Sequence, residues 1–428
     1  MRIPNDIVQQ VIDLDIVEVV QEYISINKKG SAYTACCPFH NEKTPSFNVS
    51  PAKGIYKCFG CGKGGGNIEF VMEHEGLNYR EALEELCAKF NIEIPKEEQT
   101  AEEIQAEKNR ESIFAAMNAA QKLYTPTIEF DSILQKFLSK RQISQETAQK
   151  FGIGYCKEQL SLNTIGWNSK ILAECGLEYN GKPVFADRIT FPIHNHNGQL
   201  VAFTARTLSD DKTVAKYINT KAYQLYNKSE ILYNLNRSKQ EIRKNNHAIL
   251  LEGQMDVIAL DQAGIQNTVA SSGTAFTEAQ AQTLRRFTKN ITVIFDGDKA
   301  GIAALEKSLP ILLKYGFDIY TLVLPNGQDP DEYIKTHSAE EFIQYKFDHS
   351  WGFIEHLFLL YADDYQRSII GQREVANKIL FLISQVSDFI EKHLYLKKFV
   401  ELTGIPFAAL QPEIKGLIIP RQSPKKQA

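Results

Sequence analysis

The chain has 428 residues, of which 43% are hydrophobic, and this is enough for two or three packed domains. The formal net charge of -4 excludes a protein that is basic throughout, so any nucleic-acid site must come from local charge asymmetry. No apolar run reaches the ~18 residues of a transmembrane helix, and the N-terminus lacks the apolar stretch of a secretory signal. Four of the seven cysteines fall between Cys36 and Cys61, which favours metal binding in a reducing cytosol. We therefore expect a cytoplasmic protein without membrane contact.

Residues 1–95 are predicted to form a small first domain. Helical spacing of apolar residues begins at Ile7 and again at Ile16, and short strand-like segments follow. The strands are expected at residues 31–37, 46–49 and 54–58, and two further helices at residues 68–74 and 79–90.

The rest of the chain is divided by its sequence pattern. Residues 96–112 are rich in Glu, Gln and Lys with few large apolar groups, and we interpret them as a partly helical linker. Residues 246–328 alternate between strands and helices, which is typical of a parallel α/β sheet. We expect residues 113–245 to precede this core as a mixed subdomain, and residues 329–428 to follow it as a helical subdomain with a polar tail. The fold class is therefore α+β, with several domains.

Two pairs of candidate metal ligands stand in the first domain. Cys37 and His40 are separated by two residues, as are Cys58 and Cys61, and such pairs can converge tetrahedrally on one structural Zn²⁺. Cys36 could replace Cys37 in principle, but neighbouring side chains in a strand point in opposite directions, so we predict Cys37. The alternative is a set of reduced cysteines without a metal.

Basic and aromatic residues surround these ligands. Between Ser25 and Gly65 there are six lysines, Lys43 and Lys57 among them, and one acid, Glu42. The aromatic residues that interleave with them are Phe47, Tyr56 and Phe59. Phosphate attraction and base stacking by such groups favour single-stranded DNA as the ligand. The alternative is a purely structural zinc, and some of these aromatic side chains must fill the small core.

Acidic side chains follow two strands of the predicted α/β core. Glu252 follows a strand at residues 248–251, and Asp296 and Asp298 follow a strand at residues 291–295. Ligands collect outside the carboxyl ends of strands in open parallel sheets, and these two strands are neighbours if the order is 2-1-3-4. Oxygen-only ligands favour Mg²⁺ or Mn²⁺.

Further acids could support this site. Asp256 stands one helical turn after Glu252, and Asp329 and Asp331 follow the fourth predicted strand. The alternative interpretation is that Asp296 and Asp298 are only turn and helix-capping residues.

Two of these segments resemble known families. CPFHNEKTPSF at residues 37–47 and YKCFGCGKGG at residues 56–65 resemble the zinc ribbon of bacterial DnaG-type DNA primases. The α/β core resembles the Toprim fold of primases, topoisomerases and some nucleases, through EGQMD at residues 252–256, SGTA at 272–275, FDGDKAG at 295–301 and QDPDEY at 328–333. In the primase family, the positions that match Glu252, Asp296 and Asp298 bind the catalytic metals. Gln254 stands where the family usually has an aromatic residue, which touches packing more than metal binding.

A third segment, FADRITFPI at residues 185–193, resembles the polymerase-domain signature of primases. Lone Arg and Lys residues are usually solvated surface, so only this resemblance makes five of them candidates for contacts with DNA or nucleoside triphosphate phosphates. They are Arg141, Arg188, Arg206, Lys216 and Lys228. The family usually has Gly at the positions of Gln142 and Ala205.

One segment imitates a nuclease motif. HNHNG at residues 194–198 lies between strand-like runs, and Asn197-Gly198 is a strong hairpin signal, so we predict a turn there. Cys87, Cys156 and Cys175 are predicted to be buried as apolar residues.

The resemblance spans residues 3 to about 412 and implies a DNA primase that makes short RNA primers on single-stranded DNA from ribonucleoside triphosphates. It implies one structural Zn²⁺ and two or more catalytic Mg²⁺ or Mn²⁺ ions. Glu252 and Asp296 would hold one catalytic ion, Asp296 and Asp298 the other, with Asp256 and Asp329 around them.

The family's usual C-terminal helicase-binding domain is expected to be absent, which leaves contact with a replicative helicase open. Two other classes of function also stay open. One is a Toprim nuclease or topoisomerase, although no Tyr here stands in a motif for a topoisomerase nucleophile. The other is a zinc-ribbon DNA-binding protein without catalysis.

Overall fold

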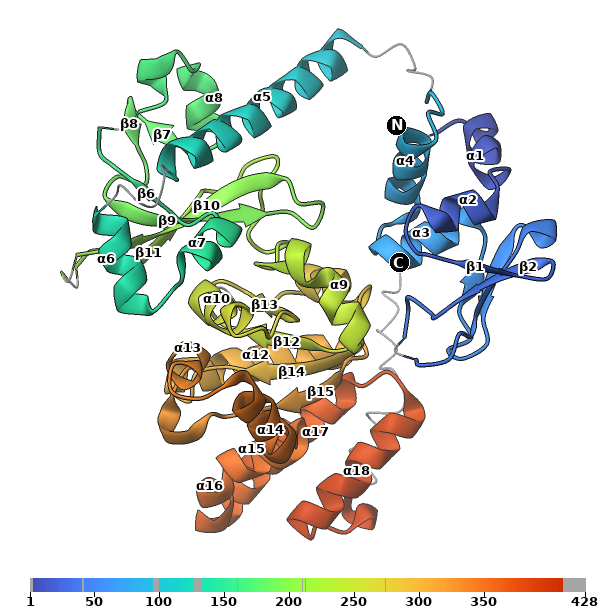
Figure 1. Ribbon diagram of the computed structural model, residues 1–428. Helices are drawn as coiled ribbons and strands as arrows, with labels where there is room; N and C mark the ends of the chain where they lie inside the picture. The colour runs from blue at the N-terminus through green and yellow to red at the C-terminus, as the bar shows by residue number, and fades with distance from the viewer. Residues whose placement is uncertain are drawn as a thin grey trace, which may run out of the picture. The chain divides into compact units, whose positions relative to one another are not determined.

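The computed structural model describes residues 3–40, 42–94, 100–125, 132–159, 161–209, 211, 213–273 and 275–410. The chain forms two compact units (Figure 1). The first contains Met1–Asn227, Asn234–His247 and Arg286–Thr288, and the second contains Lys228–Tyr233, Ala248–Arg285 and Lys289–Ala428. The chain therefore crosses between the units several times, whereas a single boundary after residue 245 was expected. Lys228, expected in the subdomain before the α/β core, belongs to the second unit.

The first unit begins with helices around a five-stranded antiparallel sheet of order β1-β2-β3-β4-β5 (Figure 1). Its elements are α1 (Asn5–Ile12), α2 (Ile16–Gln21), β1 (Asn27–Lys29), β2 (Ala32–Ala35), β3 (Phe47–Ser50), η1 (Pro51–Lys53), β4 (Ile55–Cys58), β5 (Gly64–Gly65), α3 (Asn67–Glu75) and α4 (Tyr79–Lys89). The register of β3 and β4 places Phe47 opposite Cys58. The sheet therefore holds predicted metal ligands close to its buried core. The expected strands and helices are all present, with ends shifted by at most two residues.

Most aromatic residues near the metal ligands form the core of this small domain. Phe47 and Tyr56 are buried and stack at 5.3 Å, and Phe70 packs edge-on against Tyr56. Phe59 alone of the three predicted aromatic contacts is exposed, at 76%. The expectation of a stacking surface is therefore wrong for Phe47 and Tyr56, because a domain of this size has few other large side chains to bury.

The predicted linker is largely helical. Residues 101–112 form the first half of α5 (Ala101–Tyr124), and the expected boundary at residue 112 falls inside this helix. Its second half buries Ile113, Met117 and Tyr124 on one face, and no Gly or Pro interrupts the chain between the halves. A helix anchored by one apolar face extends readily into a charged, exposed segment. Residues 96–99 of the predicted linker lie outside the described residues.

The remainder of the first unit is built on a four-stranded antiparallel sheet of order β11-β10-β9-β6. Its elements are α6 (Ser132–Arg141), α7 (Gln145–Phe151), β6 (Gly154–Cys156), η3 (Asn163–Ile165), α8 (Ser169–Glu174), β7 (Glu178–Tyr179), β8 (Lys182–Pro183), β9 (Arg188–His194), β10 (Leu200–Thr207), β11 (Tyr217–Asn219) and α9 (Leu235–Asn245). The nuclease-like segment is the β9–β10 turn, where Gly198 has φ +82° and donates to Asn195, so the prediction of a hairpin is confirmed.

The second unit contains the expected parallel sheet. The order β13-β12-β14-β15-β16 confirms that the strands before Glu252 and Asp296 are neighbours, and only β16 at the edge is antiparallel. Its elements are β12 (Ala248–Leu251), α10 (Gln254–Gln262), β13 (Thr268–Ala270), α11 (Glu278–Arg285), β14 (Asn290–Ile294), α12 (Lys299–Lys314), β15 (Asp318–Thr321), η4 (Pro325–Gly327), α13 (Pro330–Ile334), α14 (Ala339–His349) and β16 (Trp351–Gly352). All four residues of β12 are buried, as in a strand covered on both faces.

Helices complete the second unit. They are α15 (Phe353–Leu360), α16 (Ala362–Arg367), α17 (Ile369–Gln385), α18 (Phe389–Thr403) and η5 (Phe407–Leu410). Helix α17 packs against α12, α16 and α18. The predicted polar tail lies outside the described residues. Cys87, Cys156 and Cys175 are buried, as predicted. Among the described residues, none of the helices has the length and apolar character needed to span a bilayer.

Candidate metal centres and a candidate nucleic-acid pocket

Four side chains of the zinc-ribbon sheet converge on one point. The ligand atoms of Cys37, His40, Cys58 and Cys61 all lie within 4.8 Å of one another. Sγ of Cys37 is 3.9 Å from Sγ of Cys61, and Nδ1 of His40 is 3.8 Å from Sγ of Cys58. Such spacing and this donor set fit one tetrahedral Zn²⁺. Cys36 is exposed and outside the group, in agreement with the prediction of Cys37.

Glu42 holds the ligands of this site in place, a role that the sequence pattern did not predict. Its carboxylate accepts the backbone N–H of Cys37 at 2.7 Å and of Ser46 at 2.9 Å, as well as the hydroxyl of Ser46. It also lies 3.1 Å from Nε2 of His40, whose Nδ1 faces the cysteines. Desolvation opposes ionisation, but the hydrogen bonds from Ser46 and Cys37 lower the pKa of Glu42. A carboxylate that holds a ligand histidine in this way fixes its tautomer and orientation.

The surroundings of Cys58 favour the thiolate that zinc binds. Burial acts against ionisation, but the contact with the Ser46 hydroxyl and hydrogen bonds from the backbone of Cys61 and Gly60 lower the pKa of Cys58 to about 7. Gly60 is required for space, because a Cβ there would lie 2.7 Å from Nε2 of His40. The thiolate is the ligand form of cysteine, so the surroundings of Cys58 suit a metal ligand.

The second unit brings two acidic segments together at the carboxyl edge of its sheet. Leu251 and Ile294 are paired in register, and the next residues leave the sheet side by side. Oε1 of Glu252 accepts the backbone N–H of Asp296 at 3.1 Å. A Cβ on Gly301 would overlap the carbonyl oxygen of Asp296 and lie 2.7 Å from Oε1 of Glu252. Glycine at position 301 therefore leaves room for the Asp296 carbonyl and for the carboxylate of Glu252.

Two of the predicted acids also cap helices. Oδ1 of Asp298 accepts the N–H groups of Ala300 and Gly301 at 2.9 and 2.8 Å at the start of α12. Oδ1 of Asp329 accepts the N–H of Glu332 at 2.7 Å at the start of α13. Capping and metal binding are compatible, because a carboxylate has lone pairs enough for both.

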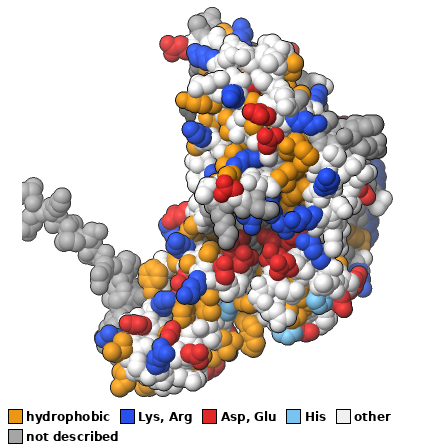
Figure 2. Space-filling view, turned by 90° about the vertical axis from the view of Figure 1, so that its left-hand side faces the viewer, with side chains coloured by type: hydrophobic (Ala, Val, Ile, Leu, Met, Phe, Trp, Pro, Cys, Tyr) orange, Lys and Arg blue, Asp and Glu red, His pale blue; other side chains and the backbone are white. Residues whose placement is uncertain are grey.

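Burial and neighbouring charges raise the pKa of Glu252 and Asp256 in this acidic group. Burial, followed by the charges of Asp296 and Asp298, raises the pKa of Glu252. Burial, followed by the charges of Asp329 and Asp296, raises the pKa of Asp256 well above its usual value. Figure 2 shows acidic side chains, in red, gathered on one face of the molecule. A divalent cation would relieve this repulsion, so the donor set fits Mg²⁺ or Mn²⁺.

The carboxylates are less tightly gathered than the zinc ligands. Among the residues that the structure describes, only the Cys/His group has its ligand atoms all within 4.8 Å. Lys335 pairs with the buried Asp331 at 2.7 Å, so Asp331 is already partly neutralised. The acids therefore lie along one edge of the sheet without forming a closed group of ligands among the described residues.

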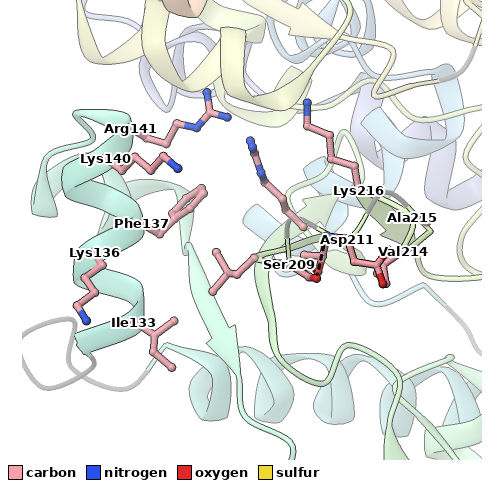
Figure 3. Close-up of a pocket in the computed structure, with 13 residues that line it drawn as sticks. Ile133, Lys136, Phe137, Lys140, Arg141, Ser209, Asp211, Val214, Ala215 and Lys216 are labelled. Atoms are coloured by element: carbon pink, nitrogen blue, oxygen red, sulfur yellow. Dashed lines mark hydrogen bonds between the residues drawn. The ribbon is translucent and has the colours of Figure 1, made fainter.

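Three predicted basic residues lie in one pocket of the first unit. The pocket has a volume of about 690 Å³ and lies between α6 and the segment from β10 to β11 (Figure 3). Arg141, Arg206 and Lys216 line it, together with Lys136 and Lys140, which the sequence analysis did not single out. Lys136 and Lys140 share one face of α6 with Arg141, and this helical spacing could have revealed them in the sequence. The positions of that face that line the pocket are 133, 136, 137, 140 and 141.

The other predicted basic residues lie elsewhere. Arg188 is half-buried and donates to the carbonyl of Ala215 at 2.9 Å, which holds the wall of the pocket, and burial lowers its pKa. Lys228 is half-buried in the second unit, with Nζ 3.4 Å from the carbonyl of Gly273. Lys43 is exposed, and Lys57 is exposed with Nζ bonded to the carbonyl of Gly62.

Three family models match successive parts of the chain. Residues 3–102 match the CHC2 zinc finger, residues 121–239 the N-terminal domain of the DNA primase catalytic core, and residues 249–334 a Toprim-like domain. A DNA primase of Listeria monocytogenes is 32% identical over the whole of this chain and 71% of its own length. The chain belongs to the family of DnaG-type DNA primases. A DNA primase of Clostridium acetobutylicum is 35% identical over 94% of this chain and 68% of its own length.

Solved primase structures share the fold. The zinc-binding and RNA polymerase domains of the Aquifex aeolicus primase match with a TM-score of 0.62 and 31% identity, over 94% of this chain and 97% of that one. A DnaG primase catalytic domain bound to single-stranded DNA matches with a TM-score of 0.62 and 27% identity, over 70% of this chain and 98% of that one. As a DNA primase, the protein is a nucleotidyltransferase that makes RNA primers.

Proposed function

We propose that this primase joins ribonucleotides by a two-metal nucleotidyl transfer at the acidic edge of its second unit. The observation that carries the proposal is the contact between the carboxylate of Glu252 and the backbone of Asp296, at 3.1 Å. It brings two segments separated by 43 residues of chain to one edge of the sheet, where Lys335 pairs with the nearby Asp331. A cluster of partly buried carboxylates is an arrangement that divalent metals stabilise.

Each acid has its own part in this proposal. Glu252 and Asp296 would hold one divalent cation, and Asp296 and Asp298 the other. Two such cations would lower the pKa of the attacking 3′-hydroxyl and stabilise the negative charge of the departing pyrophosphate. Asp298 is held by α12 and Asp329 by α13, so both carboxylates are fixed before substrate arrives. Asp256 is only 8% exposed and lies behind this edge, where it would orient the groups that surround the metal ligands.

The first unit would provide the binding of nucleic acid. The cationic pocket on α6 suits phosphate groups, and its residues include three that resemblance to primases had singled out. Lys43, Lys57 and the exposed Phe59 would let the zinc ribbon contact template bases and phosphates. One similar primase was solved with single-stranded DNA bound, which supports this ligand class. Lys228 would contact triphosphate from the second unit.

We further propose that the protein acts in the cytoplasm on single-stranded DNA and ribonucleoside triphosphates. The homologous replication enzymes and the reduced state that a Cys/His zinc site needs support this location.

A primer-synthesis assay tests the proposal. Single-stranded DNA and labelled ribonucleotides should give short RNA only when Mg²⁺ or Mn²⁺ is present. Asp296→Ala should abolish incorporation while binding of a labelled single strand persists, because the basic pocket lies in the other unit. Equal incorporation by the variant and the wild type would refute the assignment. Nicking of plasmid DNA in Mg²⁺ without any incorporation would favour a Toprim nuclease instead.

A further inference from the structure

A small pocket lies against the loop that joins β14 to α12, and all of its lining residues belong to the second unit. Its volume is about 80 Å³, and Asp296, Gly297 and Gly301 contribute the loop side of its lining. Most of the other lining side chains are apolar; they include Ile302, Leu305, Leu322 and Leu360. Apart from Asp296, His356 of α15 is the one polar side chain among the described residues that line it.

His356 has a buried nitrogen that needs a partner. Within the described part of the chain, Nδ1 of His356 is shielded from solvent and makes no hydrogen bond. Burial lowers the pKa of His356, so the ring is uncharged at neutral pH. An unpaired buried nitrogen is costly, and a pocket of about 80 Å³ has room for a water molecule, which occupies about 30 Å³. A water can bond to Nδ1 in either tautomer, because it both donates and accepts.

The position of the pocket determines what else such a water can contact. Oε1 of Glu252 accepts the N–H of Asp296 from the side of β12. Since β14 lies between β12 and β15, the residues that follow β15, Leu322 and Val323, place the pocket on the opposite side of the loop. The walls there are apolar apart from His356, and a buried water needs two or more polar partners. The loop itself is the remaining source of these partners among the lining residues that the structure describes.

We propose that His356 is a positioning residue, which holds the loop of Asp296 and Gly297 through a water molecule in this pocket. The water bonds to Nδ1 of His356 and to the backbone of the loop, and it restrains the loop on the side that Glu252 does not reach. A group that orients a metal ligand in this way contributes about 10- to 100-fold in metal affinity. The inference rests on the proposed divalent-metal site at Asp296 and adds a residue of α15 to its support.

Binding of Mn²⁺ to the full zinc-loaded chain tests the proposal without catalysis, through the loss of the electron paramagnetic resonance signal of the free ion. His356→Leu fills the space with a side chain that has no polar atom, and it should weaken Mn²⁺ binding about tenfold. His356→Asn keeps a polar atom near the position of Nδ1, so it should stay within about threefold of the wild type. His393→Leu changes an exposed histidine of α18 outside the pocket and should bind Mn²⁺ as the wild type does.

Primer synthesis provides a second readout, which separates positioning from general damage. His356→Leu should raise the Mg²⁺ concentration for half-maximal rate about tenfold and leave the KM for ribonucleotides unchanged. Wild-type Mn²⁺ affinity in His356→Leu, or an equal loss in His356→Asn, overturns the proposal.

Asp296→Ala distinguishes failure of this proposal from failure of the metal site. Weaker Mn²⁺ binding in Asp296→Ala, with wild-type affinity in His356→Leu, refutes only the role of His356. Wild-type affinity in Asp296→Ala refutes the metal site on which that role depends.

Discussion

Gly301 controls how closely the two proposed metal-binding segments approach each other. Gly301→Ala places a methyl group against the carbonyl oxygen of Asp296 and 2.7 Å from Oε1 of Glu252. The backbone between Asp296 and Gly301 has to rearrange and the Glu252 carboxylate has to move, so we expect about 1 to 3 kcal/mol of destabilisation and a loss of primer synthesis of at least about 100-fold. Thermal unfolding and a primer-synthesis assay measure the two effects.

Gly297→Ala is the matched control for stability, since it lies in the same loop. Its added Cβ would meet only Cα of Gly327 at 3.7 Å and Cγ1 of Val323 at 3.8 Å, which are ordinary contacts. We expect it to unfold at the wild-type temperature. Equal stability and activity of Gly301→Ala and the wild type would contradict the close packing of the segments.

Asp256 should make stability depend on pH when no divalent metal is present. Burial, then the charges of Asp329 and Asp296, raises the pKa of Asp256 well above the 3.8 of an unperturbed aspartate. The folded protein then holds this proton more tightly than the unfolded chain, so the stability that Asp256 contributes is complete below pH 3.8 and is lost as the pH rises through the folded pKa. Asp256→Asn should therefore raise the melting temperature near neutral pH and leave it almost unchanged in acid.

The same variant should respond less to Mg²⁺. Divalent cations relieve the repulsion that the variant has already reduced, so the rise in melting temperature on adding Mg²⁺ should be smaller than in the wild type. Asp363→Asn, an exposed carboxylate on α16, is the control for a general loss of negative charge. A lower melting temperature of Asp256→Asn at neutral pH would argue for a structural hydrogen bond at Asp256 as its main role.

At the scale of elements, the loop from β2 to β3 acts as a scaffold for the zinc site. Glu42 connects the backbone of Cys37 and Ser46 to Nε2 of His40. Glu42→Gln removes the charge that orients His40, and we expect zinc affinity to fall by roughly 10- to 100-fold. Competition with a coloured chelator measures this affinity. Lys43→Gln changes the adjacent exposed residue, and it should bind zinc as the wild type does; a matching loss there would locate the effect in the loop as a whole.

The sequence pattern predicted the candidate metal ligands better than it predicted the residues that surround them. The zinc ligands could be predicted because two short-spaced Cys/His pairs have few other uses, and the carboxylates because each follows a buried strand. Glu42 could not be singled out, since an acid in a basic loop gives no sign of three local hydrogen bonds. Phe47 and Phe59 are alike in sequence, yet only the sheet register shows that one is buried and the other exposed.

At the scale of the molecule, the alternation of strands and helices predicted the parallel sheet. The same alternation could not predict how the chain divides into two units. Residues 246–247 and 286–288 join the first unit although they belong to the predicted α/β core, and residues 228–233, which precede that core, join the second. Such crossings depend on contacts between residues far apart in the chain, which local periodicity does not encode. Helix α5 shows the opposite effect, because an apolar face in its second half determines the structure of a charged segment before it.

Two units with separate metal sites should respond separately to metals. Zinc belongs to the first unit and the proposed Mg²⁺ site to the second, and a metal stabilises only the structure that binds it, by about 2.7 kcal/mol at 100 times its dissociation constant. In calorimetry, Mg²⁺ should raise the transition of the second unit alone, and a zinc chelator should lower only that of the first. Asp296→Ala should remove the response to Mg²⁺ and keep the response to the zinc chelator. Cys58→Ser should remove the response to the chelator and keep the response to Mg²⁺, and metal analysis should show that it has lost zinc. If Mg²⁺ moved every transition equally, even in Asp296→Ala, the ion would be acting as general salt and the acidic edge would not be its site.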